Sequence, residues 1–450
     1  MYKHSLVNRP SVLLISIDGV RPDLVFQEEN YKINLPNLKK YFIKNGSYAS
    51  NGLVGVFPTL TYPSHQSIIT GTNPSTHGIY NNRVWDPEGK HLEAWEWYVS
   101  RRTPNLWEMA KENGYISANV GFPTSVGVHA DYNIAEYWRD KTELDSKVIN
   151  AVSYPQGLVN EVEKLIGRYP GYDFALESDR KRYEAASWII ENKINPQHLE
   201  KPFFMTTYFA SYDENAHNHG TFSKEALTSL EEIDNMVGKL VQLVHKVTNN
   251  NVVVAVISDH GMVDNTANIR PNTELYNAGL IKLDENGKVT NWDAYFQSSE
   301  GAGQIKLKDS NNKQVRKRVE DILNKLKNDI KSGILEIITG KEAAYELHGL
   351  PEADYVLIAK LGYELREDIK GDYLTKKLAN KATHGFLPKF PEMNCSFFIE
   401  GINVPKNMEI KVKNLIDIAS LLSSIMGFNY RGETKNQTRE RRDSSQEITI

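Results

Sequence analysis

Runs of consecutive apolar residues alternate with helical segments in the first part of this chain. The first run is Val12–Ile17, and similar β-branched or aromatic runs recur at Phe203–Phe209 and Val252–Ile257. Between the last two runs, apolar residues from Leu227 to Val247 recur every three or four positions, which predicts an amphipathic helix. Strands that are apolar throughout are typical of a sheet covered on both faces. The pattern therefore predicts an α/β fold, doubly wound around a largely parallel central sheet that helices flank.

Shorter patterns predict further elements of the same sheet. A helix is expected at Leu35–Phe42, with Asn34 as its N-cap and Gly46 near its end. Three other elements are expected: a helix that opens at 103–110 and ends near 113–114, a strand at 115–120 and a helix at 183–192.

The alternation stops at about Thr266. From there to about Asn380 the chain holds a charged helical segment, Gln314–Lys331, and short apolar runs such as Tyr355–Ala359. We expect these residues, about 266–380, to form a lobe inserted over or beside the edge of the sheet where ligands bind. Residues 1–430 are then predicted to form a single domain that includes this lobe. Residues 431–450 are predicted to form a polar, mobile tail.

Composition narrows the classes of protein that fit. The 450 residues are 40% hydrophobic and 24% charged, and the net charge of −4 provides no strong attraction to nucleic acids or membranes. The single cysteine, Cys395, excludes an intramolecular disulfide framework. Neither a signal peptide nor a membrane-spanning run is found, so we expect a cytoplasmic protein unless the natural chain has been processed or trimmed. Oligomeric state is left open.

Aspartate and histidine residues follow several of the predicted strands. They are Asp18, Asp213, His217, Asp259, His260 and His384. Because ligands of doubly wound sheets gather at the carboxyl ends of the strands, we expect these side chains on one rim of the sheet. Carboxylate and imidazole together suit zinc or a similar ion. The pattern predicts a hydrolase with two divalent metals.

A hydroxyl-rich segment, Phe57–His65, precedes a short helix-like run at Gln66–Gly71. A hydroxyl at the start of a helix lies in positive potential, and a metal beside it lowers its pKa. Thr59, Thr61 and Ser64 are all candidates for a nucleophile, and the physics does not choose among them. Turn and N-cap hydroxyls are the alternative interpretation of such a cluster.

Several short blocks, taken in order, resemble the nucleotide pyrophosphatase/phosphodiesterase family of the alkaline phosphatase superfamily. The resemblance extends to about Phe428. The blocks are Leu14–Gly19, Pro58–His65, His77–Asn82, Asp213–Gly220, Ser258–Met262 and His384–Gly385.

The resemblance implies a role for each matching residue. Thr61 matches the nucleophile, and Asn82 matches the residue that hydrogen-bonds a non-bridging phosphoryl oxygen. The implied ligands of one zinc are Asp213, His217 and His384, and those of the other are Asp18, Asp259 and His260 with the Thr61 oxygen. A neutral Asn82 suits a diester, because phosphomonoesterases of the superfamily place a cation or magnesium at the phosphate.

The resemblance also implies an activity. We expect a two-zinc phosphodiesterase or nucleotide pyrophosphatase that acts on a small-molecule phosphodiester or nucleotide through a covalent phosphothreonine, with no specific nucleic-acid partner. Tyr62 stands where many relatives have Phe, and Tyr62, Tyr137 and Trp138 are expected to line the substrate pocket. The alternatives are a phosphonate hydrolase or phosphomonoesterase of the same superfamily, or a metal-binding or nucleotide-binding protein that has lost catalysis.

Overall fold

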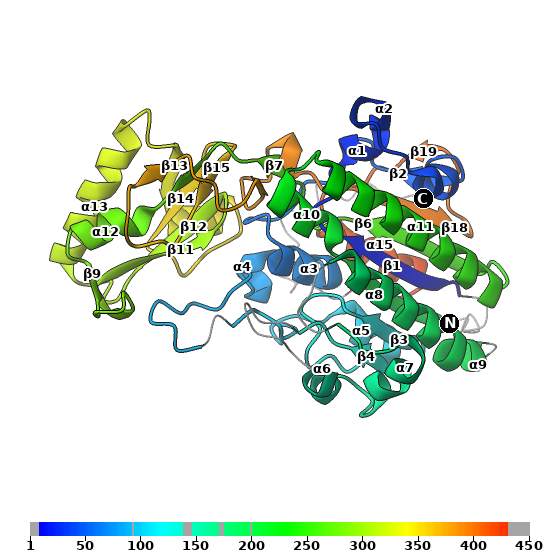
Figure 1. Cartoon of the computed structure of the whole chain (residues 1–450). Coiled ribbons are helices and arrows are strands. Elements are labelled where there is room, and N and C mark those ends of the chain that lie inside the picture. Colours follow the sequence, from blue (N-terminus) through cyan, green and yellow to red (C-terminus); the bar gives the residue numbers. More distant parts are fainter. Residues whose placement is uncertain (1–8, 92–93, 138–145, 171–174, 199, 431–450) are drawn as a thin grey trace.

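The computed structural model describes residues 9–91, 94–137, 146–170, 175–198 and 200–430. Trp138 and the expected tail at 431–450 therefore lie outside the described residues. Within these ranges eight strands form one central sheet (Figure 1). In spatial order they are β19 (Met408–Glu409), β2 (Gly46–Tyr48), β18 (Phe397–Gly401), β6 (Val252–Ile257), β1 (Ser11–Ile17), β5 (Phe203–Phe209), β3 (Ile116–Val120) and β4 (Tyr132–Ile134).

The sheet is largely parallel, as the apolar runs predicted. β1 pairs in parallel with β5 on one side and with β6 on the other, and Ile17 lies opposite Phe209. The β3 pairings with β5 and β4 are also parallel, whereas β18 is antiparallel to β6 and β2. The carboxyl ends of β1, β5 and β6 therefore meet at one edge of the sheet.

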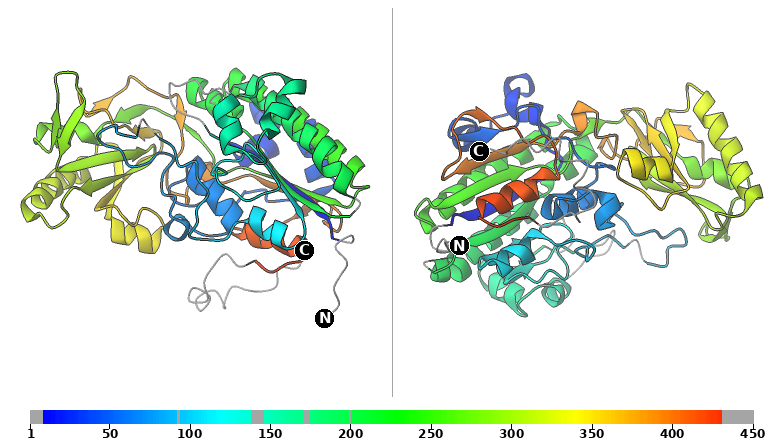
Figure 2. Two further views of the ribbon diagram at one scale, coloured as in Figure 1. Left: turned by 90° about the horizontal axis from the view of Figure 1, so that it is seen from below. Right: turned by 180° about the vertical axis from the view of Figure 1, so that it is seen from behind.

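Helices cover both faces of the sheet, which confirms the doubly wound fold (Figure 2). Leu13 and Ile15 of β1 belong to the apolar core on one face, and Val12 and Leu14 belong to the core on the other. The helices that contribute to the first core include α7 (Leu158–Ile166), α8 (Leu176–Ile189) and α11 (Lys224–Val247). Those that contribute to the second core are α3 (Thr61–Thr70), α5 (Leu106–Glu112) and α15 (Asp417–Ile425).

The remaining helices of this part are short. They are α1 (Pro22–Phe26), α2 (Glu28–Tyr31), η2 (Leu38–Ile43), α4 (Pro74–His77), α6 (Ser146–Val152), η3 (Ile190–Ile194), α9 (Asn195–His198), α10 (Ser211–His219) and η4 (Pro391–Met393). The helix expected at 183–192 is the end of α8 and its continuation in η3.

The helix expected at Leu35–Phe42 differs from the prediction. It is the π-type helix η2, which begins at Leu38, and Asn34 does not cap it. Instead Asp234 of α11 accepts hydrogen bonds from the backbone N–H groups of Asn37 and Leu38, at 3.0 and 2.7 Å. A carboxylate from a distant helix thus replaces the local cap that the sequence predicted.

A second, smaller sheet lies beside the central one (Figure 1). Its strands, in the order β11 (Ala294–Ser299), β12 (Ala302–Leu307), β14 (Tyr355–Ala359) and β13 (Ile334–Thr339), are all antiparallel. The helices of this lobe are α12 (Pro271–Asn277), α13 (Lys313–Asn328) and α14 (Gly340–Glu346). The shorter strands are β8 (Ala267–Ile269), β9 (Ile281–Leu283), β10 (Val289–Trp292), β15 (Tyr363–Leu365) and β16 (Leu374–Thr375). The expected helix at 314–331 corresponds to α13. The limits of the single domain, 1–430, and of its lobe, about 266–380, stay a prediction.

Two short strands join the lobe to the central part. β7 (Val263–Asp264) follows β6 closely, and β17 (Ala382–Thr383) precedes His384. They pair antiparallel, with Thr383 opposite Val263. This pairing brings His384 next to the segment that follows His260. No helix in the described ranges is long and apolar enough to cross a membrane.

Candidate active site and metal centre

Asp18, Asp259 and His260 form one compact group at the carboxyl edge of the sheet. Asp18 follows β1 and the Asp259–His260 pair follows β6, so the parallel pairing of these strands places them together. His260 Nε2 lies 3.3 Å from Asp18 Oδ1 and 3.2 Å from Asp259 Oδ2. All three side chains are buried. The structure thus brings together the three residues expected to bind one metal.

Asp213 and His217 reach the same edge from a helix. We expected both to follow the end of a strand, but they lie within α10, which begins two residues after β5 ends. Their spacing of four residues puts both on one face of α10, with His217 Nε2 3.3 Å from Asp213 Oδ2. His219 is exposed. The histidine of this helix that faces Asp213 is therefore His217.

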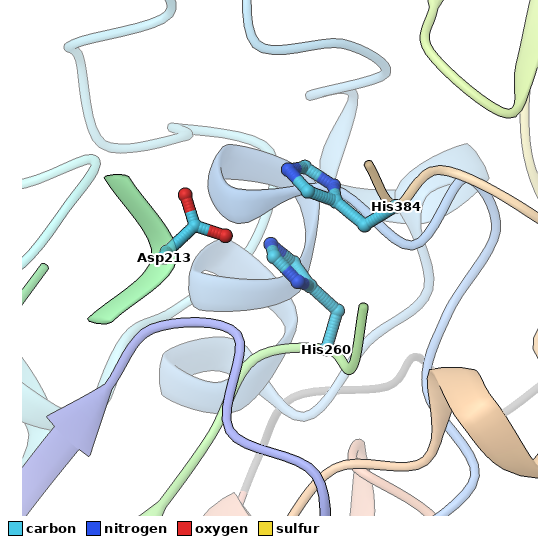
Figure 3. A group of neighbouring side chains, drawn as sticks. All are labelled: Asp213, His260 and His384. Carbon is cyan, nitrogen blue, oxygen red and sulfur yellow. The ribbon is translucent and has the colours of Figure 1, made fainter. Parts of the chain in front are cut away.

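His384 lies between the two groups. Its ring stacks on that of His260 at a centroid distance of 3.7 Å and lies 5.2 Å from the ring of His217. The side chains of Asp213, His260 and His384 point toward one another from three separate segments (Figure 3). The six residues expected to hold two metals therefore occupy one continuous cluster.

Backbone carbonyls fix which nitrogen each histidine presents. Nδ1 of His217 bonds the Ala382 carbonyl at 2.9 Å, and Nδ1 of His384 bonds the Thr59 carbonyl at 3.0 Å. Nδ1 of His260 contacts the Gly261 carbonyl at 3.0 Å. In all three residues Nε2 is left to face the cluster. Such bonds to the far nitrogen are the usual way in which metal-binding histidines are oriented.

The carboxylates of the cluster lack the partners that buried anions require. Burial, together with the charges of Asp259 and Asp213, raises the pKa of Asp18 well above its usual range. Burial and the charge of Asp213 raise the pKa of Asp259 to about 8. Asp18 Oδ1, Asp213 Oδ1 and Asp259 Oδ2 are buried without a hydrogen-bond partner. Divalent cations would satisfy these oxygens, so the residues fit the metals that the sequence pattern implies.

The pKa values of two histidines shift in opposite directions. Burial lowers the pKa of His217, but the charges of Asp213 and Glu300 outweigh burial and raise that pKa to about 10. Burial and the neighbouring His384 lower the pKa of His260 well below its usual range. Since a metal binds neutral imidazole, metal binding at His217 would release a proton.

Thr61 is the candidate hydroxyl that faces the cluster. It is the first residue of α3, and its Oγ1 lies 3.4 Å from His260 Nε2. It lines a cavity of about 110 Å³ together with Asp18, Asp213 and His384. The Thr59 hydroxyl instead donates to the Phe386 carbonyl at 3.0 Å. Ser64 is fully buried and does not line this cavity.

Asn82 also lines the cavity, beside the start of α3. Its Oδ1 accepts a hydrogen bond from the backbone N–H of Tyr62 at 2.9 Å. The side chain therefore satisfies one of the free N–H groups at the N-terminus of α3. Because Oδ1 is held by Tyr62, the Nδ2 donors are the groups left for a ligand.

The aromatic residues expected in the substrate pocket are only partly placed there. Tyr62 lines the cavity, with its hydroxyl 2.9 and 2.8 Å from the two carboxylate oxygens of Glu136. Tyr137 is not among the lining residues and instead lies against Trp97, at a ring distance of 4.1 Å. The preceding residue, Glu136, lines the cavity instead.

A sequence profile of the type I phosphodiesterase / nucleotide pyrophosphatase family matches residues 12–387. The chain belongs to this family.

The alignments with related proteins cover different shares of this chain and of each relative. It is 27% identical over 262 residues to ectonucleotide pyrophosphatase/phosphodiesterase family member 1 of Homo sapiens, covering 56% of the chain but only 24% of that relative. The ectonucleotide pyrophosphatase/phosphodiesterase 1 of Saccharomyces cerevisiae is 24% identical over 98% of the chain and 60% of its own length. A bis(5'-adenosyl)-triphosphatase of Pongo abelii is 23% identical over 93% of the chain and 78% of its own length. The chain thus spans about a quarter of the length of the human relative.

Solved structures share the fold. An inactive variant of murine ectonucleotide pyrophosphatase/phosphodiesterase 5 in complex with AMP superposes with a TM-score of 0.65 over 96% of this chain and 99% of that one, at 18% identity. The human counterpart superposes equally well, with a TM-score of 0.65 at 17% identity.

Three polar residues of the site, Tyr208, Glu136 and Glu300, were not predicted from the sequence. Tyr208 of β5 donates a hydrogen bond to Asp18 Oδ2, and Glu136 contacts Tyr62. Glu300 of the lobe lines the cavity and lies 3.3 Å from His384 Nε2. Tyr208 lies inside a mostly apolar strand, where an aromatic residue is expected to belong to the hydrophobic core. Glu300 precedes Gly301 in the turn between β11 and β12, which reads as an exposed turn. Neither position carries a local signal of function.

Gly19 lies between Asp213 and Asp259, and its surroundings leave no room for a side chain. Its φ is +72°, and an added Cβ would lie 2.8 Å from Asp213 Oδ1. Its backbone N–H donates to Asp259 Oδ1 at 3.2 Å. The absence of a side chain thus lets the two acidic segments approach each other.

We expect Gly19→Ala to lower the free energy of unfolding by more than the cost of a left-handed alanine, which is about 1–2 kcal/mol. Gly89→Ala is the matched control, because Gly89 has a φ of +64° and open space around an added Cβ. Urea unfolding of both variants measures the difference, which reports the contact with Asp213. Equal losses of stability would show that this contact is unimportant.

Proposed function

We propose that this chain is a phosphodiesterase or nucleotide pyrophosphatase that uses Thr61 as its nucleophile. The observation that carries the proposal is the position of the Thr61 hydroxyl, at the start of α3 and against a cluster of three aspartates and three histidines. The three aspartates converge on one site although buried anions repel each other. Such clusters are common at catalytic centres.

The proposed reaction proceeds in two displacements. Thr61 Oγ1 attacks phosphorus, and the oxygen of the leaving group departs from the opposite side, which gives a phosphothreonine. Water then attacks the same phosphorus and releases Thr61. Two inversions produce overall retention of configuration. The Nδ2 group of Asn82 would donate a hydrogen bond to a non-bridging oxygen as negative charge develops there.

Two divalent cations fit the proposed site, with zinc as the first choice for this ligand set. Asp18, Asp259 and His260 would hold one, and Asp213, His217 and His384 the other. When bound, such ions lower the pKa of a neighbouring hydroxyl or water and offset charge on phosphate oxygens. Thr61 would present its hydroxyl to the phosphorus atom. His65 helps to hold Thr61 in place, because its Nδ1 bonds the Thr61 carbonyl at 2.7 Å.

The charge of the cavity favours a diester or anhydride over a monoester. No Lys or Arg is among the cavity-lining residues that the structure describes. The donor that we propose for the phosphate is the neutral amide of Asn82. A monoester dianion carries one more charge to offset than a diester. A nucleotide substrate is supported by two comparisons, namely the bis(5'-adenosyl)-triphosphatase among the relatives and the AMP bound to the murine neighbour.

A substrate panel tests the proposal directly. We expect the zinc-loaded protein to hydrolyse aryl and nucleotide diesters and dinucleoside polyphosphates faster than the corresponding monoesters and phosphonates, with products identified by mass. Chelation should abolish turnover, and added zinc should restore it. Faster monoester or phosphonate cleavage would assign the chain to those activities instead. Bound metal without any turnover would indicate a binding protein.

A further inference from the structure

Glu300 belongs to the lobe and lies beside the cluster of aspartates and histidines. It has no role in the chemistry described above. It lies in the tight turn between β11 and β12, and its φ is +61°, a left-handed value that is uncommon for residues other than glycine. The turn is held on both sides of Glu300. Its backbone N–H donates to Ser298 Oγ at 2.8 Å, and its carbonyl accepts from the N–H of Leu365 at 2.7 Å. The fold thus maintains an unfavourable backbone conformation at this carboxylate.

The Glu300 carboxylate is aimed at the histidines. Its Oε2 accepts a hydrogen bond from the Thr383 hydroxyl and another from the backbone N–H of His384. The same oxygen lies 3.3 Å from His384 Nε2. Glu300, His217 and His384 each offer one ligand atom, and these three atoms lie within 4.8 Å of one another. His384 is shared with a second such group, in which its partners are Asp213 and His260. Asp213 Oδ1 is buried without a hydrogen-bond partner.

The nitrogen that Glu300 faces identifies its role. A carboxylate that only orients a metal-binding histidine bonds the ring nitrogen that points away from the metal. On His384 that nitrogen is Nδ1, and the Thr59 carbonyl already bonds it at 3.0 Å. Glu300 instead lies next to Nε2, which faces the cluster. Its position is therefore that of a neighbouring ligand rather than of an orienting group.

The spacing agrees with this role. Two ligands of one tetrahedral zinc, with bonds of about 2.0–2.2 Å, have their donor atoms roughly 3.3–3.5 Å apart. The distance between Glu300 Oε2 and His384 Nε2 is 3.3 Å. The same distance, 3.3 Å, separates Asp213 Oδ2 from His217 Nε2. Both pairs have the separation that two ligands of one metal require.

We propose that Glu300 is a further protein ligand of the metal held by Asp213, His217 and His384. This inference deepens the proposed function and rests on the two-metal part of it. Each group of three would then gain a fourth donor, and that donor is an oxygen atom in both. It is the Thr61 hydroxyl in one group and the Glu300 carboxylate in the other. The lobe would thereby take part in metal binding directly.

Zinc titration of the full chain and of Glu300→Gln tests the proposal. Glutamine keeps an oxygen that accepts from Thr383 and His384, but it lacks the charge of a strong ligand. We expect two zinc equivalents in both proteins at saturation, with one of them bound about 10–100-fold more weakly by the variant. Cobalt-substituted protein should show a changed visible spectrum. Glu300→Gly is the second variant, because glycine suits the left-handed turn.

The matched control is Glu214→Gln, which removes one negative charge from the same cavity wall without touching the histidine group. It should bind both zinc ions with an affinity within about threefold of the natural chain. An effect below fivefold in Glu300→Gln, or an equal effect in the control, would overturn the proposal.

Metal binding separates this inference from the proposed function. If diesters are cleaved while Glu300→Gln binds zinc normally, the inference fails and the function stands. If no substrate is cleaved but the variant loses affinity for one zinc, the inference stands and the function fails.

Discussion

Thr61→Ala is expected to lower the turnover of an aryl phosphodiester by at least about 10³-fold, or about 4 kcal/mol of activation free energy. The variant removes the one oxygen that we propose attacks phosphorus. The carboxylates and imidazoles of the cluster remain, so zinc content should be largely retained. Turnover and zinc content are measured on the same preparation. Near-normal turnover would contradict the assignment of Thr61.

Two further variants separate the nucleophile from its neighbours. Thr61→Ser keeps a hydroxyl at the start of α3 and should retain part of the activity. Ser64→Ala removes the neighbouring candidate hydroxyl, which is buried without a hydrogen-bond partner, and should leave turnover within a few-fold of the natural chain. Acid quenching during turnover should yield phosphothreonine at Thr61, identified by peptide mass. A loss of activity in Ser64→Ala with none in Thr61→Ala would reverse the assignment.

Asn82→Ala is expected to lower diester kcat by about 10²–10³-fold, or roughly 2.7–4 kcal/mol, the usual cost of removing one donor to a developing oxyanion. This substitution has a second consequence, because Asn82 Oδ1 also bonds the N–H of Tyr62. The loss of that bond should cost about 1 kcal/mol of stability. Turnover and urea unfolding must therefore be measured together.

Asn82→Asp distinguishes these two effects. Aspartate keeps an oxygen for the Tyr62 N–H but offers no donor and adds a negative charge near the phosphate. Its stability should therefore match that of the natural chain, while its diester kcat should fall at least as far as in Asn82→Ala. If Asn82→Asp cleaved diesters normally, the amide would not be a donor to the substrate, and the argument for a diester would lose one of its supports.

The sequence predicted the parts of this structure in which one physical rule dominates. The runs at Phe203–Phe209, Val252–Ile257 and Tyr355–Ala359 are strands with the expected limits, because a strand buried on both faces consists mostly of apolar, β-branched and aromatic residues. The parallel pairing then placed Asp18, Asp259 and His260 together. The prediction was wrong where a local signal competes with a distant contact, as at Asn34, which is replaced as a cap by Asp234.

The rest of the site depends on the relative positions of separate segments. Asp213 and His217 looked like residues after a strand, and only their common face on α10 shows how they act as a pair. Tyr137 was expected in the pocket, but the preceding Glu136 points inward instead. Glu300 reads as a turn residue in the sequence. Its proximity to His384 follows from the turn between β11 and β12, which no periodicity in the chain encodes.

The pairing of β7 with β17 closes the neck through which the chain enters and leaves the lobe. Because these two strands pair with each other, the length of the lobe between them can change without shifting Asp259, His260 or His384. Insertions in the exposed loops of the lobe should therefore be tolerated by the catalytic part, much as surface loops tolerate them elsewhere. The turn that carries Glu300 is the exception, since the Glu300 carboxylate lies 3.3 Å from His384 Nε2. A graft that exchanged the lobe between relatives would need to transplant this turn intact.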